Sequence, residues 1–200
     1  PPLPHVRYAP ATPRLCRPAE GTDQGRAAIV LHHVSLIITA LGGAFLFNAR
    51  RKDEAVVQLQ KTLELDQNFW IAHLFLGNAL LDRKQFPEAI AEFTKARDFS
   101  GGNSEAISMI AYAWARAGDT AKARALLDEF LALSARRYIP PYNIAAVYLW
   151  LGDRNQTFAW LEKPYTDHEV SLSIIHDDPM WDPVSTDPRF VSIMQRLGLE

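Results

Sequence analysis

The sequence predicts an all-α solenoid of about four helix-turn-helix units, closed by a C-terminal capping helix. The first observation is that small residues recur every 34 positions without an insertion or deletion. The second is that large apolar residues recur at the same interval. The third is a C-terminal segment in which this period stops and a short amphipathic helix is expected. A period of this length is typical of arrays in which each unit is a pair of antiparallel helices.

Two columns of small residues define the repeat. The units align as 36–69, 70–103, 104–137 and 138–171. The eighth position of the units holds Gly43, Gly77, Ala111 and Ala145, and the twentieth holds Ala55, Ala89, Ala123 and Thr157. Antiparallel helices approach closely only where the side chains at their crossing are short. We therefore expect these positions to lie where the two helices of each unit cross.

Large apolar residues fill two further columns. The eleventh position holds Leu46, Leu80, Trp114 and Tyr148, and the twenty-fourth holds Leu59, Phe93, Leu127 and Leu161. These residues predict a core that runs between the helices. The fourth unit departs from the pattern at Pro164, which lacks a backbone N–H and clashes with the preceding turn. We expect its second helix to end near Lys163.

The best copy of the unit combines Phe75-Leu76-Gly77-Asn78-Ala79-Leu80 with the segment Pro87 to Ala96 (PEAIAEFTKA). This pattern resembles the tetratricopeptide repeat, which has a large apolar residue, then Gly or Ala, and later Ala, Phe or Leu, and Ala at these offsets. The resemblance implies a right-handed α-solenoid that acts as a non-catalytic interaction module. It also implies that a protein or peptide partner binds in a concave groove lined by the first helices.

A second resemblance covers residues 36–200. The segments that carry it are Tyr138-Ile139-Pro140-Pro141-Tyr142-Asn143-Ile144-Ala145, Leu151-Gly152-Asp153, Trp160-Leu161-Glu162-Lys163 and Asp187-Pro188-Arg189-Phe190. They are similar to the C-terminal tetratricopeptide tail of bacterial multidomain regulators. This implies an alternative function as the regulatory or dimerisation tail of a larger signalling or transcription regulator, with an output domain expected upstream. It also allows a homodimer.

Composition narrows the classes of partner and compartment. The formal net charge is −2, and the sequence has no strongly basic balance. Nucleic-acid binding usually requires a basic face that neutralises phosphates, so no nucleic-acid partner is expected. The single cysteine, Cys16, cannot form an internal disulfide, which suits a reducing compartment. We therefore expect a cytoplasmic protein.

The N-terminal segment 1–33 is expected to be a disordered leader rich in Pro and Arg. Six of the 13 prolines lie within its first 18 residues. A segment with so few large apolar groups cannot bury enough surface to offset the entropy lost on ordering.

The stretch Ala27 to Asn48 supports a rival interpretation. It contains no Asp, Glu, Lys or Arg and precedes Arg50-Arg51-Lys52. Twenty-two uncharged residues are long enough to span a bilayer. The alternative function is therefore a single-span, membrane-anchored assembly scaffold. Gly43 keeps the repeat register inside this stretch, and a buried solenoid helix is also apolar nearly all round. We favour the buried helix, so a membrane partner is not expected.

Residues 172–200 are expected to form a C-terminal cap. Asp187 can cap the N-terminus of a helix that has Pro188 at its first position. Phe190, Ile193, Met194 and Leu197 form one apolar face, and Gly198 ends the helix. Met180 and Trp181 are expected to pack beneath it. Solenoids need such a cap for solubility.

The sequence contains none of the common catalytic motifs. Phosphate-binding loops, dinucleotide fingerprints, nucleophile elbows and zinc-protease helices are all absent. The best polar cluster, His168, His176, Asp177 and Asp178, has spacing that does not place its histidines on one helical turn. We therefore predict no enzyme activity, no catalytic residues, no cofactor and no metal.

The partner-binding residues are predicted on the first helix of each unit, at the positions that face the concave side in this fold. They are Asn48, Asn78, Asp82, Tyr112, Arg116, Tyr142 and Trp150. Aromatic side chains and Arg dominate interface energetics, and an Asn amide can hold a peptide backbone.

Overall fold

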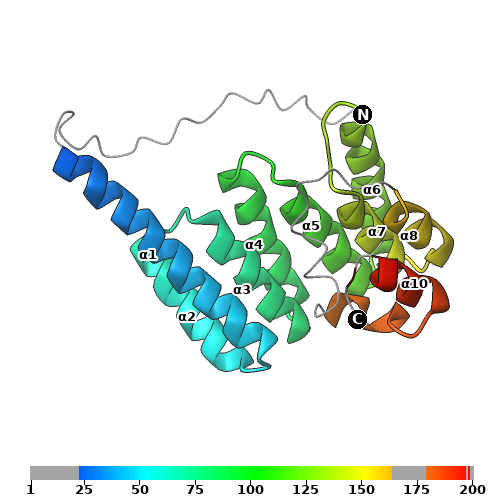
Figure 1. The fold of residues 1–200 in the computed structure, drawn as a ribbon, viewed down its shortest axis with the longest axis horizontal. Helices are drawn as coiled ribbons and strands as arrows, with labels where there is room; N and C mark the ends of the chain where they lie inside the picture. The colour runs from blue at the N-terminus through cyan, green and yellow to red at the C-terminus, as the bar shows by residue number, and fades with distance from the viewer. Residues whose placement is uncertain (1–22, 164–178, 197, 199–200) are drawn as a thin grey trace.

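The computed structural model describes residues 23–163, 179–196 and 198, and these residues form helices and turns without a strand (Figure 1). The helices are α1 (Asp23–Asn48), α2 (Lys52–Leu65), α3 (Trp70–Asp82), α4 (Phe86–Phe99), α5 (Ser104–Arg116), α6 (Thr120–Ser134), α7 (Pro141–Trp150), α8 (Arg154–Leu161), the 3-10 helix η1 (Pro179–Val184) and α10 (Pro188–Arg196). The prediction of an all-α chain is confirmed.

The first eight helices form four hairpins that follow one another along the long axis of the molecule (Figure 1). The first helices are α1, α3, α5 and α7, and each is followed after a short turn by its partner α2, α4, α6 or α8. Second helices also contact the first helix of the next hairpin, as α2 does with α3 and α4 with α5. This is a tetratricopeptide-like solenoid, as the 34-residue period predicts.

The two small-residue columns explain how closely the helices of a hairpin approach. A Cβ atom added at Gly77 would lie 2.5 Å from Cε1 of Phe93, and one at Gly43 would lie 2.6 Å from Cγ of Leu59. Each glycine therefore makes room for the large residue of the same unit. The twentieth position is fully buried in all four units, at Ala55, Ala89, Ala123 and Thr157.

Side chains and glycines set the helix boundaries. The side chain of Asn103 accepts hydrogen bonds from the backbone N–H groups of Glu105 and Ala106 at the start of α5. Asp119 and Asp153 cap α6 and α8 in the same way. Gly118 and Gly152 have φ angles of 88° and 81°, which let the chain reverse between helices at no steric cost.

The N-terminal boundary differs from its prediction. The leader was expected to extend to residue 33, but α1 begins at Asp23. No proline follows Pro18 in this region, so nothing in the backbone chemistry stops the apolar helix from starting earlier than the repeat register indicates. Residues 1–22, the polar cluster at His168 to Asp178, and Pro164 lie outside the described residues.

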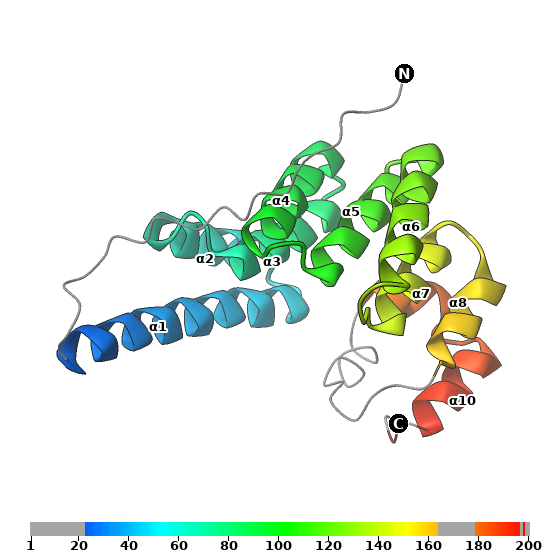
Figure 2. The same ribbon diagram turned by 90° about the horizontal axis from the view of Figure 1, so that it is seen from above.

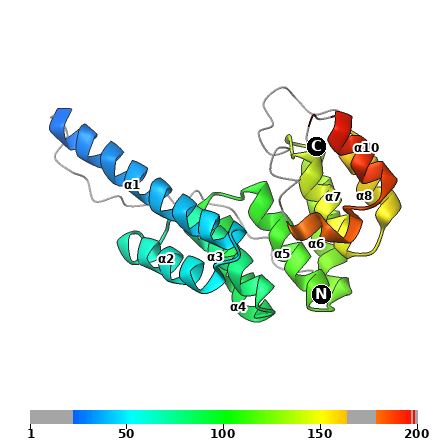
Figure 3. The ribbon, with the colours of Figure 1, turned by 60° about the horizontal axis from the view of Figure 1, so that its bottom comes forward.

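The C-terminal end of the solenoid is covered by η1 and α10, as predicted (Figure 3). Asp187 accepts a hydrogen bond from the backbone N–H of Arg189 at 3.0 Å, which caps α10. The apolar face of α10 packs in one core with residues of α7, α8 and η1. That core includes Ala145, Leu149, Phe158, Leu161, Trp181, Val184, Phe190, Ile193 and Met194. The rings of Trp181 and Phe190 stack with their centroids 6.1 Å apart.

A candidate partner-binding surface on the first helices

The predicted partner-binding residues lie on the first helices, and we call the surface they form the first-helix surface. Asn48 is the last residue of α1 and is exposed, while Asn78 and Asp82 lie one turn apart on α3. Tyr112 and Arg116 lie one turn apart on α5, and Tyr142 and Trp150 lie on α7. The seven residues are therefore spread over all four hairpins. Only some of them are brought together.

Tyr112, Arg116 and Trp150 meet between α5 and α7, and we call them the aromatic–arginine cluster. The rings of Tyr112 and Trp150 have centroids 5.0 Å apart and are tilted by 50°. The guanidinium carbon of Arg116 lies 5.2 Å from the Trp150 ring centroid and 5.7 Å from that of Tyr112. Nη1 of Arg116 donates a hydrogen bond to the Tyr112 hydroxyl at 3.2 Å. These contacts fix the orientation of a cation and an indole on the first-helix surface.

The structure changes the role expected of Tyr112. Its side chain is only 5% exposed and belongs to the core formed by α3, α4 and α5. Met180 of η1 packs against the same core. Tyr112 therefore supports Arg116 and Trp150 from beneath, and the half-buried side chains of those two residues remain accessible.

Oδ1 of Asn78 and Nε1 of Trp150 are almost fully buried and have no hydrogen-bond partner in the part of the chain that the structure describes. Buried polar groups are nearly always paired, and leaving one unpaired costs about 1–3 kcal/mol. Because both atoms are buried, a ligand could reach them only after the side chains around them shift.

Asp82, by contrast, is already engaged. Its carboxylate forms an ion pair with Lys52 at the start of α2, and the neighbouring Arg83 pairs with Asp53. These two pairs tie the second hairpin to the first. The sequence alone suggests a ligand contact for Asp82, whereas its observed contacts are structural.

Asn48 and Tyr142 are not part of the cluster. Asn48 lies at the exposed end of α1, two hairpins away along the chain from α5. Tyr142 is half-buried near the start of α7 and packs against the core that the C-terminal cap completes. Tyr142 therefore contributes to the closed end of the solenoid.

One buried polar contact was missed by the sequence analysis. The side chain of Asn143 is 2% exposed, and its Nδ2 donates a hydrogen bond to Oγ of Ser104 at 3.2 Å. The pair joins the N-terminal ends of α7 and α5. A polar residue within the otherwise apolar start of α7 was the only signal for it in the sequence.

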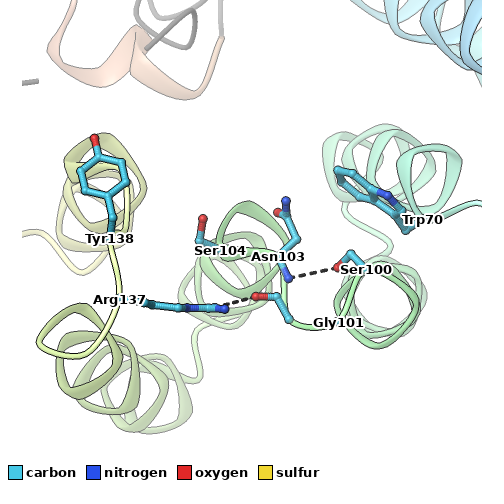
Figure 4. A pocket seen from close by; sticks show the side chains of 8 residues that line it. Trp70, Ser100, Gly101, Asn103, Ser104, Arg137 and Tyr138 are labelled. Carbon is cyan, nitrogen blue, oxygen red and sulfur yellow. Dashed lines mark hydrogen bonds between the residues drawn. The ribbon is translucent and has the colours of Figure 1, made fainter. Parts of the chain in front are cut away.

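An open pocket of about 240 Å³ lies near the N-terminal end of α5 (Figure 4). Its walls come from the start of α3, the turn between α4 and α5, and the turn between α6 and α7. Trp70, Ser104, Arg137 and Tyr138 are among the residues that line it. Nη2 of Arg137 donates a hydrogen bond to the backbone oxygen of Gly102 at 2.6 Å. This contact holds the guanidinium against the turn, so the pocket mainly reflects how adjacent hairpins join.

The buried His73 and the partly buried Glu92 form a pair between α3 and α4. Nδ1 of His73 lies 2.5 Å from Oε2 of Glu92, and Nε2 lies 2.9 Å from the backbone oxygen of Gln67. Burial raises the pKa of the Glu92 carboxyl, but hydrogen bonds from His73 and Lys95 outweigh this effect and hold it below its ordinary value. Within the described ranges no group of three His, Cys, Asp or Glu residues gathers at metal-binding distance. The pair is therefore a structural contact of the second hairpin.

The chain was compared with protein families, curated proteins and solved structures. The sequence matches no protein-family model, and no curated protein matches it. Among solved structures, the chain is similar to YrrB, described as a TPR protein with an unusual peptide-binding site. The similarity covers 86% of this chain and 89% of YrrB, with 14% identity and a TM-score of 0.47. At this identity no binding residue is transferred from YrrB to this chain.

Proposed function

We propose that the chain is a non-catalytic protein interaction module that binds a peptide or a partner helix along α3, α5 and α7. The observation that carries this proposal is the aromatic–arginine cluster, in which Arg116 and Trp150 are held half-buried against Tyr112. Trp and Arg are the residue types that dominate binding energies at protein interfaces. Their side chains are already oriented, so binding orders few further rotamers.

The chemistry of the surface favours a ligand that offers hydrogen-bond acceptors to Arg116. Arg116 forms no ion pair with a carboxylate in the described part of the chain, so its charge can meet an acidic side chain or a carbonyl oxygen. A peptide backbone presents carbonyl oxygens along its length.

The experiment is a selection of binders from a random 12-residue peptide display library against the full chain, followed by fluorescence anisotropy with the selected peptides. The Arg116→Ala, Trp150→Ala double variant should bind them at least about 30-fold more weakly, since loss of an interface hot spot costs about 2 kcal/mol or more. Circular dichroism should report an unchanged helix content.

The chain offers a matched control for this experiment. Nζ of Lys122 lies 3.9 Å from the ring centroid of Trp114, which is a second cation–aromatic pair outside the first-helix surface residues. The Trp114→Ala, Lys122→Ala variant should retain peptide affinity. Equal losses in the two double variants would mean that general destabilisation explains the effect. Unchanged affinity in the Arg116 and Trp150 variant would move the binding site elsewhere.

A further inference from the structure

The outward face of α1 is the largest apolar feature that the described hairpins leave uncovered. Helix α1 has 26 residues, and in three views its N-terminal half projects beyond α2 (Figures 1, 2 and 3). One side of the helix is packed into the solenoid through Leu36, Ala40, Gly43 and Ala44. The opposite side is exposed and carries Val30, Leu31, Val34, Ile37, Ile38, Leu41 and Phe45. Monomeric proteins rarely expose an apolar stripe of this extent.

The repeat register identifies what this face is. Ile38, Leu41 and Phe45 occupy the same unit positions as Ala72, Phe75 and Ala79 on α3, and as Ala106, Met109 and Ala113 on α5. On α3 these residues pack in one core with Val56 and Leu59 of α2. The same face of α5 packs on α4. The outward face of α1 is therefore the face that another helix covers in the later hairpins.

The residues on the face distinguish between possible occupants. In α3 and α5 the two alanines of this face are fully buried, and they allow the preceding helix to approach closely. On α1 the equivalent residues are Ile38 and Phe45, which are 64% and 73% exposed. Side chains of this size prevent a helix from packing as closely as α2 packs on α3. The occupant is thus not simply one more hairpin of the same geometry.

A bilayer around the whole helix is also disfavoured. The stretch Val30–Asn48 is long and apolar enough to span a membrane by length and composition. Only 17% of it is buried in the fold, so the expectation that it forms a buried solenoid helix was wrong for its outward face. Its buried side lies against α2, which carries Lys52, Asp53, Glu54 and Lys61. Spanning lipid would draw these charges into hydrocarbon at a high energetic cost.

We propose that this face is a homodimer interface in which α1 of a second copy packs against Val30, Val34, Ile37, Ile38, Leu41 and Phe45. Val30, Val34, Ile37 and Leu41 follow the alternating spacing of four and three residues that pairs helices in coiled coils. These six large apolar side chains are each 40–73% exposed, so pairing two copies of the face removes a continuous apolar surface from water, as a stable interface of about 800 Å² on each partner requires.

The other end of the solenoid determines the symmetry of the pairing. Because η1 and α10 already cover α8, a second copy cannot stack head to tail on the C-terminal end. A two-fold pairing of α1 with α1 needs no other surface of the molecule and closes at the dimer. Because the stripe carries no charge, two copies of it can pack together without electrostatic repulsion.

The test is sedimentation equilibrium of the full chain between about 1 and 100 µM. Wild type should form dimers, and the Ile38→Glu, Phe45→Glu variant should raise the dimer dissociation constant at least about tenfold, because each new charge would be buried in an apolar interface. Val191→Glu is the matched control, since Val191 is 41% exposed on α10, at the other end of the solenoid. It should leave the dimer intact.

A second measurement keeps the proposal testable if the charged variant unfolds. In a Cys16→Ser background, Ile38→Cys should form a disulfide-linked dimer on mild oxidation, whereas Val191→Cys should not. A monomeric wild type at 100 µM, or a dimer insensitive to both changes at the stripe, would overturn the proposal. So would a monomer that co-sediments with phosphatidylcholine vesicles, because lipid would then be the occupant.

Discussion

The two ends of this solenoid expose their last helices to different surroundings. At the C-terminal end, η1 and α10 bury Trp181, Phe190 and Met194 against α7 and α8. At the N-terminal end, α1 presents the equivalent kind of apolar surface to solvent. Each unit of a repeat protein contacts only its neighbours, so a terminal unit lacks half of its stacking contacts. The C-terminal unit gains such contacts from η1 and α10 of its own chain, whereas no helix among the described residues covers the outward face of α1.

The difference predicts that similar substitutions at the two ends have very different costs. Trp181→Ala should lower the free energy of unfolding by about 3–5 kcal/mol, because it empties a fully packed site. Phe45→Ala should change it by less than about 0.5 kcal/mol in the monomer, because its ring is 73% exposed. Urea denaturation followed by circular dichroism, at a concentration where the chain is monomeric, provides both values. Similar costs for the two variants would show that the ends do not differ in burial.

Two glycines allow a second comparison between a packed site in the core and an open site on α1. Gly77→Ala should cost about 1–3 kcal/mol, because the new methyl group would collide with the ring of Phe93. Gly42 lies on α1 at the position held by Leu76 and Ile110 in the next two first helices, and a Cβ there would meet no atom within 4 Å. Gly42→Ala should therefore stabilise the monomer by about 0.5–1 kcal/mol through helix propensity. The same denaturation assay tests both, and a loss of stability at Gly42 would mean that its face is covered in the monomer.

Glu92 lies in the second hairpin, which has a neighbouring hairpin on each side. A change at its partly buried carboxylate should alter the free energy of unfolding less than the changes above. Since the pKa of Glu92 is lowered from its ordinary value of 4.5, the folded chain binds fewer protons there than the unfolded chain. The charged Glu92 carboxylate therefore stabilises the fold above its ordinary pKa. This stabilisation is lost as the pH falls through the lower pKa that Glu92 has in the folded chain. Glu92→Gln should destabilise the chain by about 1 kcal/mol at neutral pH.

The difference between wild type and Glu92→Gln should shrink between about pH 5 and about pH 3. Glu129→Gln serves as its control, because Glu129 is exposed on α6. Stability measured across this range by urea denaturation gives the comparison. A difference that stays constant with pH would mean that the charge of the Glu92 carboxylate does not cause it.

The fold could be predicted from the sequence because its contacts repeat at a fixed spacing. Gly77 and Phe93 belong to one unit, so their contact is local and recurs as Gly43 with Leu59. The same local logic predicted the cap from Asp187 and Pro188. The start of α1 was misplaced because the repeat register marks this helix only from residue 36 onward, whereas the helix begins at Asp23.

The candidate site was harder to predict because it depends on contacts between units. Register placed Tyr112, Arg116 and Trp150 on first helices, but only the packing of α5 against α7 brings the three together. Burial of Tyr112 depends on the core beneath it. The pairing of Asp82 with Lys52 depends on long side chains of separate hairpins, which a repeat pattern does not specify.

Hydrogen–deuterium exchange of the full chain at about 1 µM and about 100 µM tests most directly the claim that one end of the solenoid is closed and the other open. Amides of α1 should exchange more slowly at the higher concentration, because association covers that helix and stabilises its first turns. Amides of α8 and α10 should exchange at the same rate at both concentrations. Protection of α1 that is independent of concentration would contradict the account, as would a concentration effect confined to the C-terminal cap.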